Sequence, residues 1–183
     1  MILLRHGQTL WNLHYGQTRV DPDLPDPGLT ETGRQQAEAA ATALVGRGVS
    51  LLFASPYQRT LETAAVVARR LNVPIFVEPL LRERAGFSCD IGTRAGMLVK
   101  AWPDNDFSAL DEQWWCELGE TDDQVLARAR AFRTAIAGRP DRASICAVTH
   151  WGVIRALTGE TVENGAIREH DPCGSLPSPA PMC

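Results

Sequence analysis

The sequence predicts an α/β fold, a three-layer sandwich in which a mostly parallel central sheet carries helices on both faces. Two observations support this prediction. Short apolar runs of strand length alternate with longer segments in which apolar residues recur at helical spacing. A length of 183 residues also suits one domain with a substantial core. Strands separated by helices pair in parallel, and the expected strands are residues 1–4, 51–54, 75–77 and 145–148.

The expected helices have start signals and apolar faces of their own. The first begins near Thr30 or Thr32, because Thr32 and Gln35 form a capping-box pattern. Gly46 and Gly48 end it. The other expected helices are residues 59–71, 93–101, 121–137 (with a capping-box pattern at Thr121 and Gln124) and a last one after His150.

The domain organisation follows from the irregular stretches. After Asn12 the chain is rich in Pro, Asp and Gly as far as Gly28, and we expect a surface loop there. Residues 1–170 form one expected domain, with residues 79–120 as a small cap insertion. We expect most of the cap aromatics to form a satellite core under a long loop. These aromatics are Trp102, Phe107, Trp114 and Trp115, and the Pro- and Ser-rich residues 171–183 are a predicted disordered tail.

Composition excludes several classes of function. A net charge of −4 disfavours nucleic-acid binding. Five cysteines without C-x-x-C spacing disfavour a disulfide framework or a zinc site and favour a reducing cytoplasm. No apolar run approaches the roughly 20 residues of a membrane helix, so no membrane partner is expected. The oligomeric state stays open.

Polar residues follow three of the expected strands. The first strand ends in Arg5 and His6, the second leads to Ser55 and then Arg59, and the fourth leads to His150. Parallel strands deliver these residues to one edge of the sheet, where open α/β sheets bind ligands. Two arginines and two histidines at one spot repel each other unless an anion is present. The pattern therefore predicts an anion-binding site with a histidine that is nucleophilic near neutral pH.

Four ordered motifs over about 150 residues carry a resemblance to a known family. Arg5, His6, Gly7, Thr9 and Asn12 form R-H-G-x-T-x-x-N. Residues 29–37 read L-T-x-x-G-x-x-Q-A, residues 55–64 read S-P-x-x-R-x-x-x-T-A, and residues 149–152 read T-H-W-G. This set resembles the signature of the histidine phosphatase superfamily, the phosphoglycerate-mutase-like enzymes.

The resemblance implies a phosphomonoester phosphatase that works through a phosphohistidine on His6. It implies that Arg5, Arg59 and His150 hold the phosphoryl oxygens, helped by Asn12. Guanidinium and imidazolium groups then supply the charge that phosphoryl transfer needs, so no metal and no cofactor are expected. The expected substrate is a small phosphorylated molecule or a phosphoprotein.

The proton donor is less well marked. The family draws it from a glutamate after the third strand, and Glu83 is the matching residue. The residues after Glu83 depart from the family's usual G-x-x-x-G pattern, so Asp90 is a second candidate for the proton donor. Alternatively, Glu83 is a surface carboxylate paired with Arg82 or Arg84. A further departure is Trp151, which replaces a glycine and either walls the pocket or packs on the sheet.

Three rival functions remain. A phosphoglycerate mutase would transfer phosphate between hydroxyls, but this chain lacks the longer insertions that mutases use to exclude water. A non-catalytic module would bind a phosphorylated ligand, and the intact pair of His6 and Glu83 argues against it. A metal enzyme would use His6, His14, His150 and His170, and the number of histidines is the only observation that supports this alternative.

Overall fold

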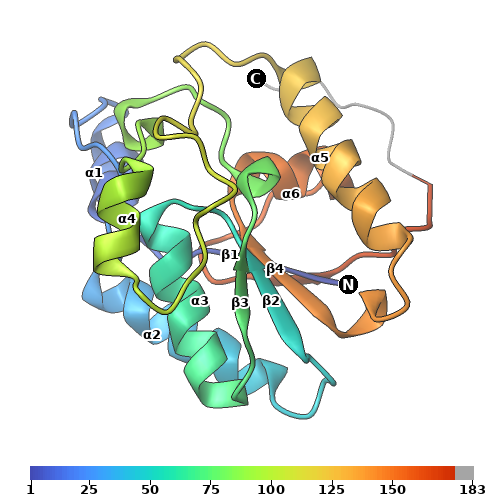
Figure 1. Cartoon of the computed structure of the whole chain (residues 1–183). Helices are drawn as coiled ribbons and strands as arrows, with labels where there is room; N and C mark the ends of the chain where they lie inside the picture. Colours follow the sequence, from blue (N-terminus) through green and yellow to red (C-terminus); the bar gives the residue numbers. More distant parts are fainter. Residues whose placement is uncertain (176–183) are drawn as a thin grey trace.

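The central sheet has five strands in the order β3-β2-β4-β1-β5. The computed structural model describes residues 1–175; the predicted tail beyond them, residues 176–183, lies outside the described part. β1 pairs in parallel with β4, and β2 pairs in parallel with β4 and β3, as predicted. An antiparallel edge strand beside β1 was not predicted. The strands are β1 (Ile2–Arg5), β2 (Leu51–Ala54), β3 (Ile75–Val77), β4 (Ile145–Thr149) and β5 (Ile167–Glu169) (Figure 1).

Helices cover both faces of the sheet, which confirms the three-layer α/β fold. α2 (Glu31–Leu44) and α3 (Gln58–Leu71) lie on one face, and α5 (Asp122–Ala137) and α6 (Trp151–Thr158) on the other (Figure 1). Successive side chains of β1 point to opposite faces of the sheet and so contribute to two hydrophobic cores. Ile2 and Leu4 join the core under α2 and α3, whereas Met1 and Leu3 join the core under α5 and α6.

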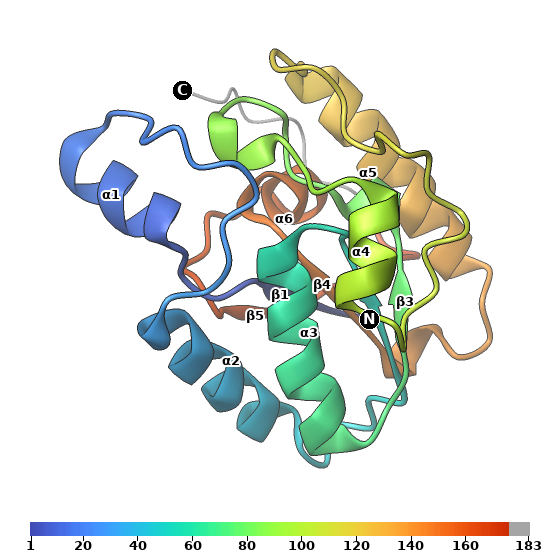
Figure 2. The ribbon, with the colours of Figure 1, turned by 60° about the vertical axis from the view of Figure 1, so that its left-hand side comes forward.

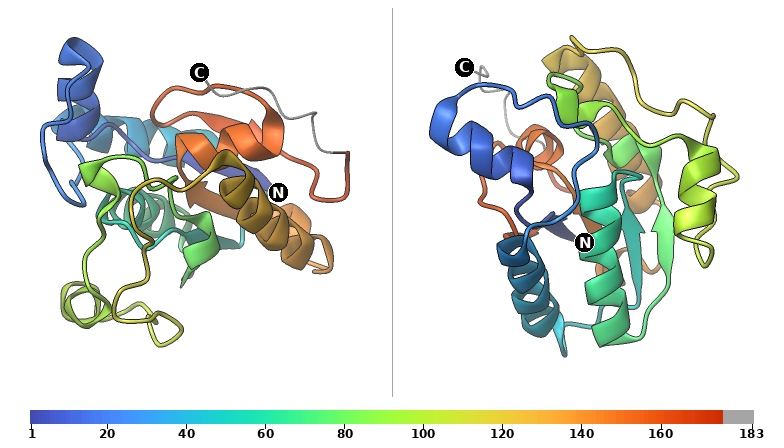
Figure 3. Two further views of the ribbon diagram at one scale, coloured as in Figure 1. Left: turned by 90° about the horizontal axis from the view of Figure 1, so that it is seen from above. Right: turned by 90° about the vertical axis from the view of Figure 1, so that its left-hand side faces the viewer.

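A helix that was not predicted follows β1. We expected a loop after Asn12, but α1 runs over Leu10–Thr18. Thr9 and Asn12 are its capping box, because the Thr9 hydroxyl accepts from the Asn12 backbone N–H and the Asn12 side chain accepts from that of Thr9. Only Trp11 in α1 is fully buried, and the helix projects beyond α2 and α3 (Figures 2 and 3).

The helix starts agree with the sequence in one case and differ in another. Thr121 caps α5 in the predicted capping box with Gln124. At α2 the cap is Thr30, whose hydroxyl accepts from the backbone N–H of Gly33, so the alternative start at Thr32 is wrong. Thr32 has no such role because it already lies in the first helical turn.

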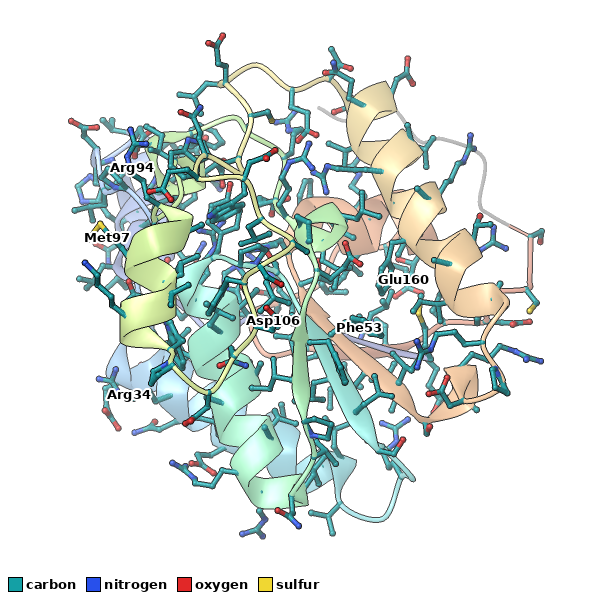
Figure 4. The ribbon with its side chains drawn as sticks, viewed as in Figure 1. Arg34, Phe53, Arg94, Met97, Asp106 and Glu160 are labelled. Carbon is teal, nitrogen blue, oxygen red and sulfur yellow. The ribbon has the colours of Figure 1, made fainter. Side chains whose placement is uncertain are left out.

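The segment over residues 79–120 is mostly irregular, with two short 3₁₀ turns at Pro79–Leu81 and Ser88–Asp90 and the expected helix as α4 (Ala95–Ala101). Figure 4 marks Met97 on the outer side of α4, where it is 61% exposed. The cap aromatics do not form a separate satellite core. Phe107 and Trp114 are buried in the core under α2 and α3, with Trp102 and Trp115 packed against it, because the segment folds back onto α3.

No helix in residues 1–175 combines the length and apolarity that a membrane crossing requires. The four cysteines within this range carry free thiols. The cytoplasmic location stays a prediction.

Candidate active site

The parallel register brings the ends of β1, β2 and β4 together. Arg5 pairs with Thr149 across β1 and β4, so His6 and His150 follow side by side. Their ring centroids are 5.1 Å apart in an edge-on arrangement. β2 flanks β4 on its other side, which brings Ser55 to the same edge. The convergence expected from the sequence is therefore produced by strand register alone.

His6 is held in one tautomer. Its Nδ1 lies 2.7 Å from the Gly7 carbonyl oxygen. Because a carbonyl oxygen only accepts, Nδ1 carries the proton and Nε2 keeps its lone pair. Burial, together with the charges of Arg59 and Arg5, holds the pKa of His6 well below its usual range. The ring is thus a neutral imidazole with an unprotonated nitrogen at physiological pH.

His150 lies between Arg59 and Ser55. Arg59 Nε donates to His150 Nδ1 at 3.3 Å, so the proton of His150 sits on Nε2, which lies 2.9 Å from the Ser55 hydroxyl oxygen. Burial and the charge of Arg59 hold the pKa of His150 well below its usual range. His150 is therefore a neutral donor until an anion arrives nearby.

Arg5 has unused donor capacity. One guanidinium nitrogen donates to the Val162 carbonyl oxygen at 2.6 Å. Its Nε is buried and, within the described residues, has no hydrogen-bond partner. Burial lowers the pKa of Arg5, while the carboxylates of Glu83 and Glu163 act in the opposite direction. A buried donor without a partner costs free energy that an arriving acceptor would recover.

Arg59 is fully enclosed by partners. Its side chain is 3% exposed, and it forms an ion pair at 3.1 Å with Asp90, which is 2% exposed. A second nitrogen donates to the Cys89 carbonyl oxygen at 2.7 Å, and the guanidinium carbon lies 4.2 Å from the centroid of the Tyr57 ring. Burial opposes the charge, but Cys89 and Asp90 raise the pKa of Arg59. This cation stays charged and fixed in one orientation.

Glu83 sits at the N-terminus of α6. Its carboxylate accepts from the Gly152 backbone N–H at 3.0 Å and from the Arg84 backbone N–H at 2.8 Å. Burial, and then the charge of Asp90, raise the pKa of Glu83 above its usual value. No ion pair with Arg82 or Arg84 forms, because these arginines pair instead with Glu120 and Asp122. The surface-pair alternative for Glu83 is therefore wrong.

Both carboxylate oxygens of Asp90, the second candidate for the proton donor, already accept hydrogen bonds. Oδ1 accepts from the Arg59 guanidinium, and Oδ2 accepts from the backbone N–H groups of Gly86 and Phe87, each at 3.1 Å. Burial nevertheless raises the pKa of Asp90. Its contacts are those of a carboxylate that anchors a loop to an arginine.

Comparison with known proteins identifies the group to which this chain is related. The family model for the histidine phosphatase superfamily (branch 1) matches residues 1–171. The chain belongs to the histidine phosphatase superfamily. A bifunctional protein of Mycobacterium tuberculosis is 31% identical over 173 residues, covering 91% of this chain and 45% of that protein. The chain thus spans less than half the length of that relative.

Two further relatives share more of their length with this histidine phosphatase superfamily member. The glucosyl-3-phosphoglycerate phosphatase of Mycobacterium tuberculosis is 32% identical over 173 residues, covering 86% of this chain and 73% of that enzyme. The crystal structure of a candidate alpha-ribazole-5'-P phosphatase from Escherichia coli aligns with a TM-score of 0.65 at 24% identity, over 96% of this chain and 93% of that one. This second likeness supports the fold.

One polar residue near His6 was missed by sequence reasoning. Asn164 lies between α6 and β5, and its Nδ2 donates to the His6 carbonyl oxygen at 3.1 Å and to Asn12 Oδ1 at 3.3 Å. Asn12 itself, predicted as a phosphate ligand, uses Oδ1 to cap α1. The only signal for Asn164 was its Asn-Gly dipeptide, which predicts a turn and no contact.

The four histidines of the metal-enzyme rival do not gather in this superfamily member. His14 is exposed on α1, and His170 lies beside Met1 at the opposite end of β1 from His6. Within residues 1–175 no group of three or more His, Cys, Asp or Glu side chains is arranged to hold a metal ion. The metal-enzyme alternative therefore has no site in the described part of the chain.

Trp151 begins α6 directly after His150 and is half-buried. The guanidinium carbon of Arg155 lies 5.1 Å from the centroid of the Trp151 ring, within the range of a cation–π contact. Trp151 thus packs along its own helix, one turn from Arg155. Its role as a wall of the pocket stays a prediction.

Proposed function

We propose that this chain is a phosphomonoester phosphatase in which His6 Nε2 attacks phosphorus and forms a phosphohistidine. The single observation that carries the proposal is the 2.7 Å contact between His6 Nδ1 and the Gly7 carbonyl oxygen. It leaves Nε2 as the nitrogen with a free lone pair. Burial and two arginines keep that nitrogen unprotonated at neutral pH.

The first chemical step forms the bond from His6 Nε2 to phosphorus and breaks the bond from phosphorus to the ester oxygen. The leaving oxygen takes a proton from Glu83, whose raised pKa favours the protonated form. In the second step water attacks phosphorus, Glu83 takes back a proton, and the bond to Nε2 breaks. Inorganic phosphate leaves, and the histidine returns to its neutral state.

The charge on the transferring group is neutralised by Arg5, Arg59 and His150. Support comes from the unpartnered Nε of Arg5 and from the fixed guanidinium of Arg59. Burial, and then the charge of Arg59, lower the pKa values of both His6 and His150. A phosphate dianion would relieve the repulsion within the cluster. Such prearranged positive charge is the main source of catalysis in phosphoryl transfer. The proposed reaction therefore uses no metal ion.

The proposed substrate class is a small phosphorylated metabolite. Its support is the relationship to the glucosyl-3-phosphoglycerate phosphatase, an enzyme whose name describes a phosphorylated carbohydrate acid. A phosphoprotein would have to reach a nucleophile that is only 3% exposed. A short phosphomonoester reaches such a histidine more readily than a folded protein does.

The test is to trap the intermediate. Acid-free quenching during turnover of p-nitrophenyl phosphate should leave an adduct of roughly 80 Da on the peptide with His6, stable in base and lost in acid. His6→Ala should lack both adduct and turnover, whereas His14→Ala, on the exposed side of α1, should keep both. An adduct on another residue would overturn the proposal. Transfer to an added hydroxyl compound instead of water would favour the mutase, and binding without turnover would favour the binding module.

A further inference from the structure

The segment between α6 and β5 binds the backbone of the Arg-His-Gly motif at several points. The Ala166 carbonyl oxygen accepts from the Arg5 N–H at 3.0 Å, and the Val162 carbonyl oxygen accepts from the Arg5 side chain at 2.6 Å. The Gly165 N–H lies 3.2 Å from the Arg5 carbonyl oxygen and 3.1 Å from that of His6. Apart from the bond from the Arg5 side chain, these are main-chain contacts. They fix where β1 ends and do not depend on residue type, except at Gly165.

Gly165 itself admits no side chain. Its φ is +75°, and a Cβ there would lie 2.9 Å from the Cβ of Gln36 on α2. The left-handed conformation of Gly165 turns the chain so that its own N–H and the side chain of Asn164 both reach the carbonyl oxygen of His6. The turn at Asn164 and Gly165 thus places the Asn164 side-chain amide at the end of β1.

Asn164 is the side chain that joins the nucleophile to α1. One nitrogen, Nδ2, contacts the His6 carbonyl oxygen and Asn12 Oδ1. Asn12 Oδ1 also accepts from Thr9 N at 3.1 Å, so this atom must be the oxygen and the Asn12 amide nitrogen points elsewhere. The bridge therefore sets the distance between the backbone of His6 and the donor group of Asn12.

We propose that Asn164 is a positioning residue that holds the Asn12 amide nitrogen in register with His6, so that both engage the same phosphoryl group. This inference rests on the proposed function and adds a residue to it. Asn164 touches neither phosphorus nor the leaving group. It acts through Asn12, because its amide is the only described side chain that contacts both the His6 carbonyl oxygen and the Asn12 side chain.

The residue type matters for a simple reason. Both acceptors of Asn164 are oxygens, so only a donor fits between them. Asn164→Asp keeps the shape but places a carboxylate against two oxygen atoms, and Asn164→Ala removes the bridge without adding charge. We expect the aspartate to be the more harmful of the two.

The experiment is a double-mutant cycle between Asn164 and Asn12. Asn12→Asp retains the oxygen that caps α1 but loses the amide donor, so positioning of that donor no longer matters. Asn164→Ala should lower kcat/KM for p-nitrophenyl phosphate about tenfold in the wild-type background and less than about twofold in the Asn12→Asp background. Inhibition by inorganic phosphate should weaken by the same factors. Thr161→Ala, an exposed position in the same loop, is the control.

Equal losses in the two backgrounds would overturn the proposal, because Asn164 would then act only on the fold. Wild-type rates in Asn164→Asp would overturn it as well. Melting temperatures of all variants show whether a loss reflects unfolding. A wild-type protein that binds phosphate without hydrolysing esters would refute the proposed function alone. The phosphate-binding cycle would still test whether Asn164 positions Asn12.

Discussion

The carboxylate of Glu83 reaches the backbone N–H of Gly152 at 3.0 Å, at the start of α6. This contact explains why a glycine ends the third motif. A Cβ at position 152 would overlap Glu83 Oε1. The absent side chain and the helix N-terminus together hold a carboxyl group close to His150, which precedes α6. The departure at Trp151 leaves this arrangement intact, because the α6 residue that donates to the carboxylate is Gly152.

We therefore expect Gly152→Ala to displace Glu83 and to impair proton transfer without removing the phosphate pocket. Hydrolysis of an alkyl phosphate should fall by at least about tenfold, while inhibition by inorganic phosphate changes little. Alanine is a better helix former than glycine, so α6 should not lose stability. The measurement compares hydrolysis rates and phosphate inhibition constants of Gly152→Ala with those of the wild type. A parallel loss of phosphate binding would show that Gly152 serves the pocket instead.

Glu83→Gln tests the proton donor itself. It should slow hydrolysis of an alkyl phosphate by about 10²–10⁴-fold, the usual worth of a positioned acid. The loss should be smaller for p-nitrophenyl phosphate, whose leaving group barely needs a proton. Because the pKa of Glu83 is raised, the wild-type rate on the alkyl ester should fall as pH rises through that value, and the variant should lack this basic limb. Equal losses on the two substrates would assign Glu83 a binding role.

Asp90→Asn, unlike Glu83→Gln, should lower the stability of the protein and should not distinguish between the two substrates. If its oxygen keeps the contacts to Gly86 and Phe87, its amide nitrogen faces the Arg59 guanidinium, and two donors then meet. Losing one partner of a buried ion pair typically costs about 3–5 kcal/mol in the free energy of unfolding. Activity on the two substrates should fall by similar factors, because Arg59 serves both. Denaturant titration and paired kinetics measure these effects, with the exposed Asp104→Asn as control. A loss confined to the alkyl ester would make Asp90 the donor.

The sheet and the convergence of Arg5, His6 and His150 could be predicted because each depends on local signals. Buried parallel strands are short apolar runs, and their polar ends necessarily share an edge. The helix α1 was missed for a related reason. Thr9 and Asn12 match a motif that indicates phosphate chemistry, but the same T-x-x-N spacing also caps a helix. One pair of side chains can serve both purposes, and spacing alone cannot separate them.

Other features depend on contacts that no local pattern encodes. Asn164 meets Asn12 across 152 sequence positions. β5 has three partly buried or exposed residues, so it lacks the apolar run that marks a strand. On α5 the apolar Leu126 is only partly buried. Arg128 is buried there instead, paired at 2.8 Å with Glu120. A buried arginine is found only through its partner, and that partner lies outside the helix.

We expect metal independence, because the proposed phosphate cradle is built from side chains. Hydrolysis of p-nitrophenyl phosphate should be unchanged by EDTA and by added magnesium or zinc, since Arg5, Arg59 and His150 are expected to supply the positive charge. The measurement compares initial rates before and after dialysis against chelator, with metal content determined in both samples. Loss of activity that a single divalent ion restores would contradict this prediction.

The two buried neutral histidines should each contribute a loss of stability in acid. The pKa values of His6 and His150 are lowered on folding, so the unfolded chain binds more protons below its histidine pKa of about 6.5. The free energy of unfolding then decreases as pH falls below that value, by up to about 1.4 kcal/mol per pH unit for each histidine. The slope of each histidine is about half-maximal at pH 6.5 and fades within about one pH unit above it.

The carboxyls of Asp26, Glu83 and Asp90 act in the opposite sense, because their raised pKa values favour the folded state at lower pH. A difference measurement therefore isolates the histidine contribution. Denaturant titrations of the wild type and of His6→Asn between pH 5 and 8 should give slopes that differ by up to about 1.4 kcal/mol per unit below pH 6.5 and converge above it. His14→Asn, on an exposed residue, should reproduce the wild-type slope. If His6→Asn also reproduces that slope, His6 is not buried as a neutral ring, and the nucleophile proposed for this site loses its basis.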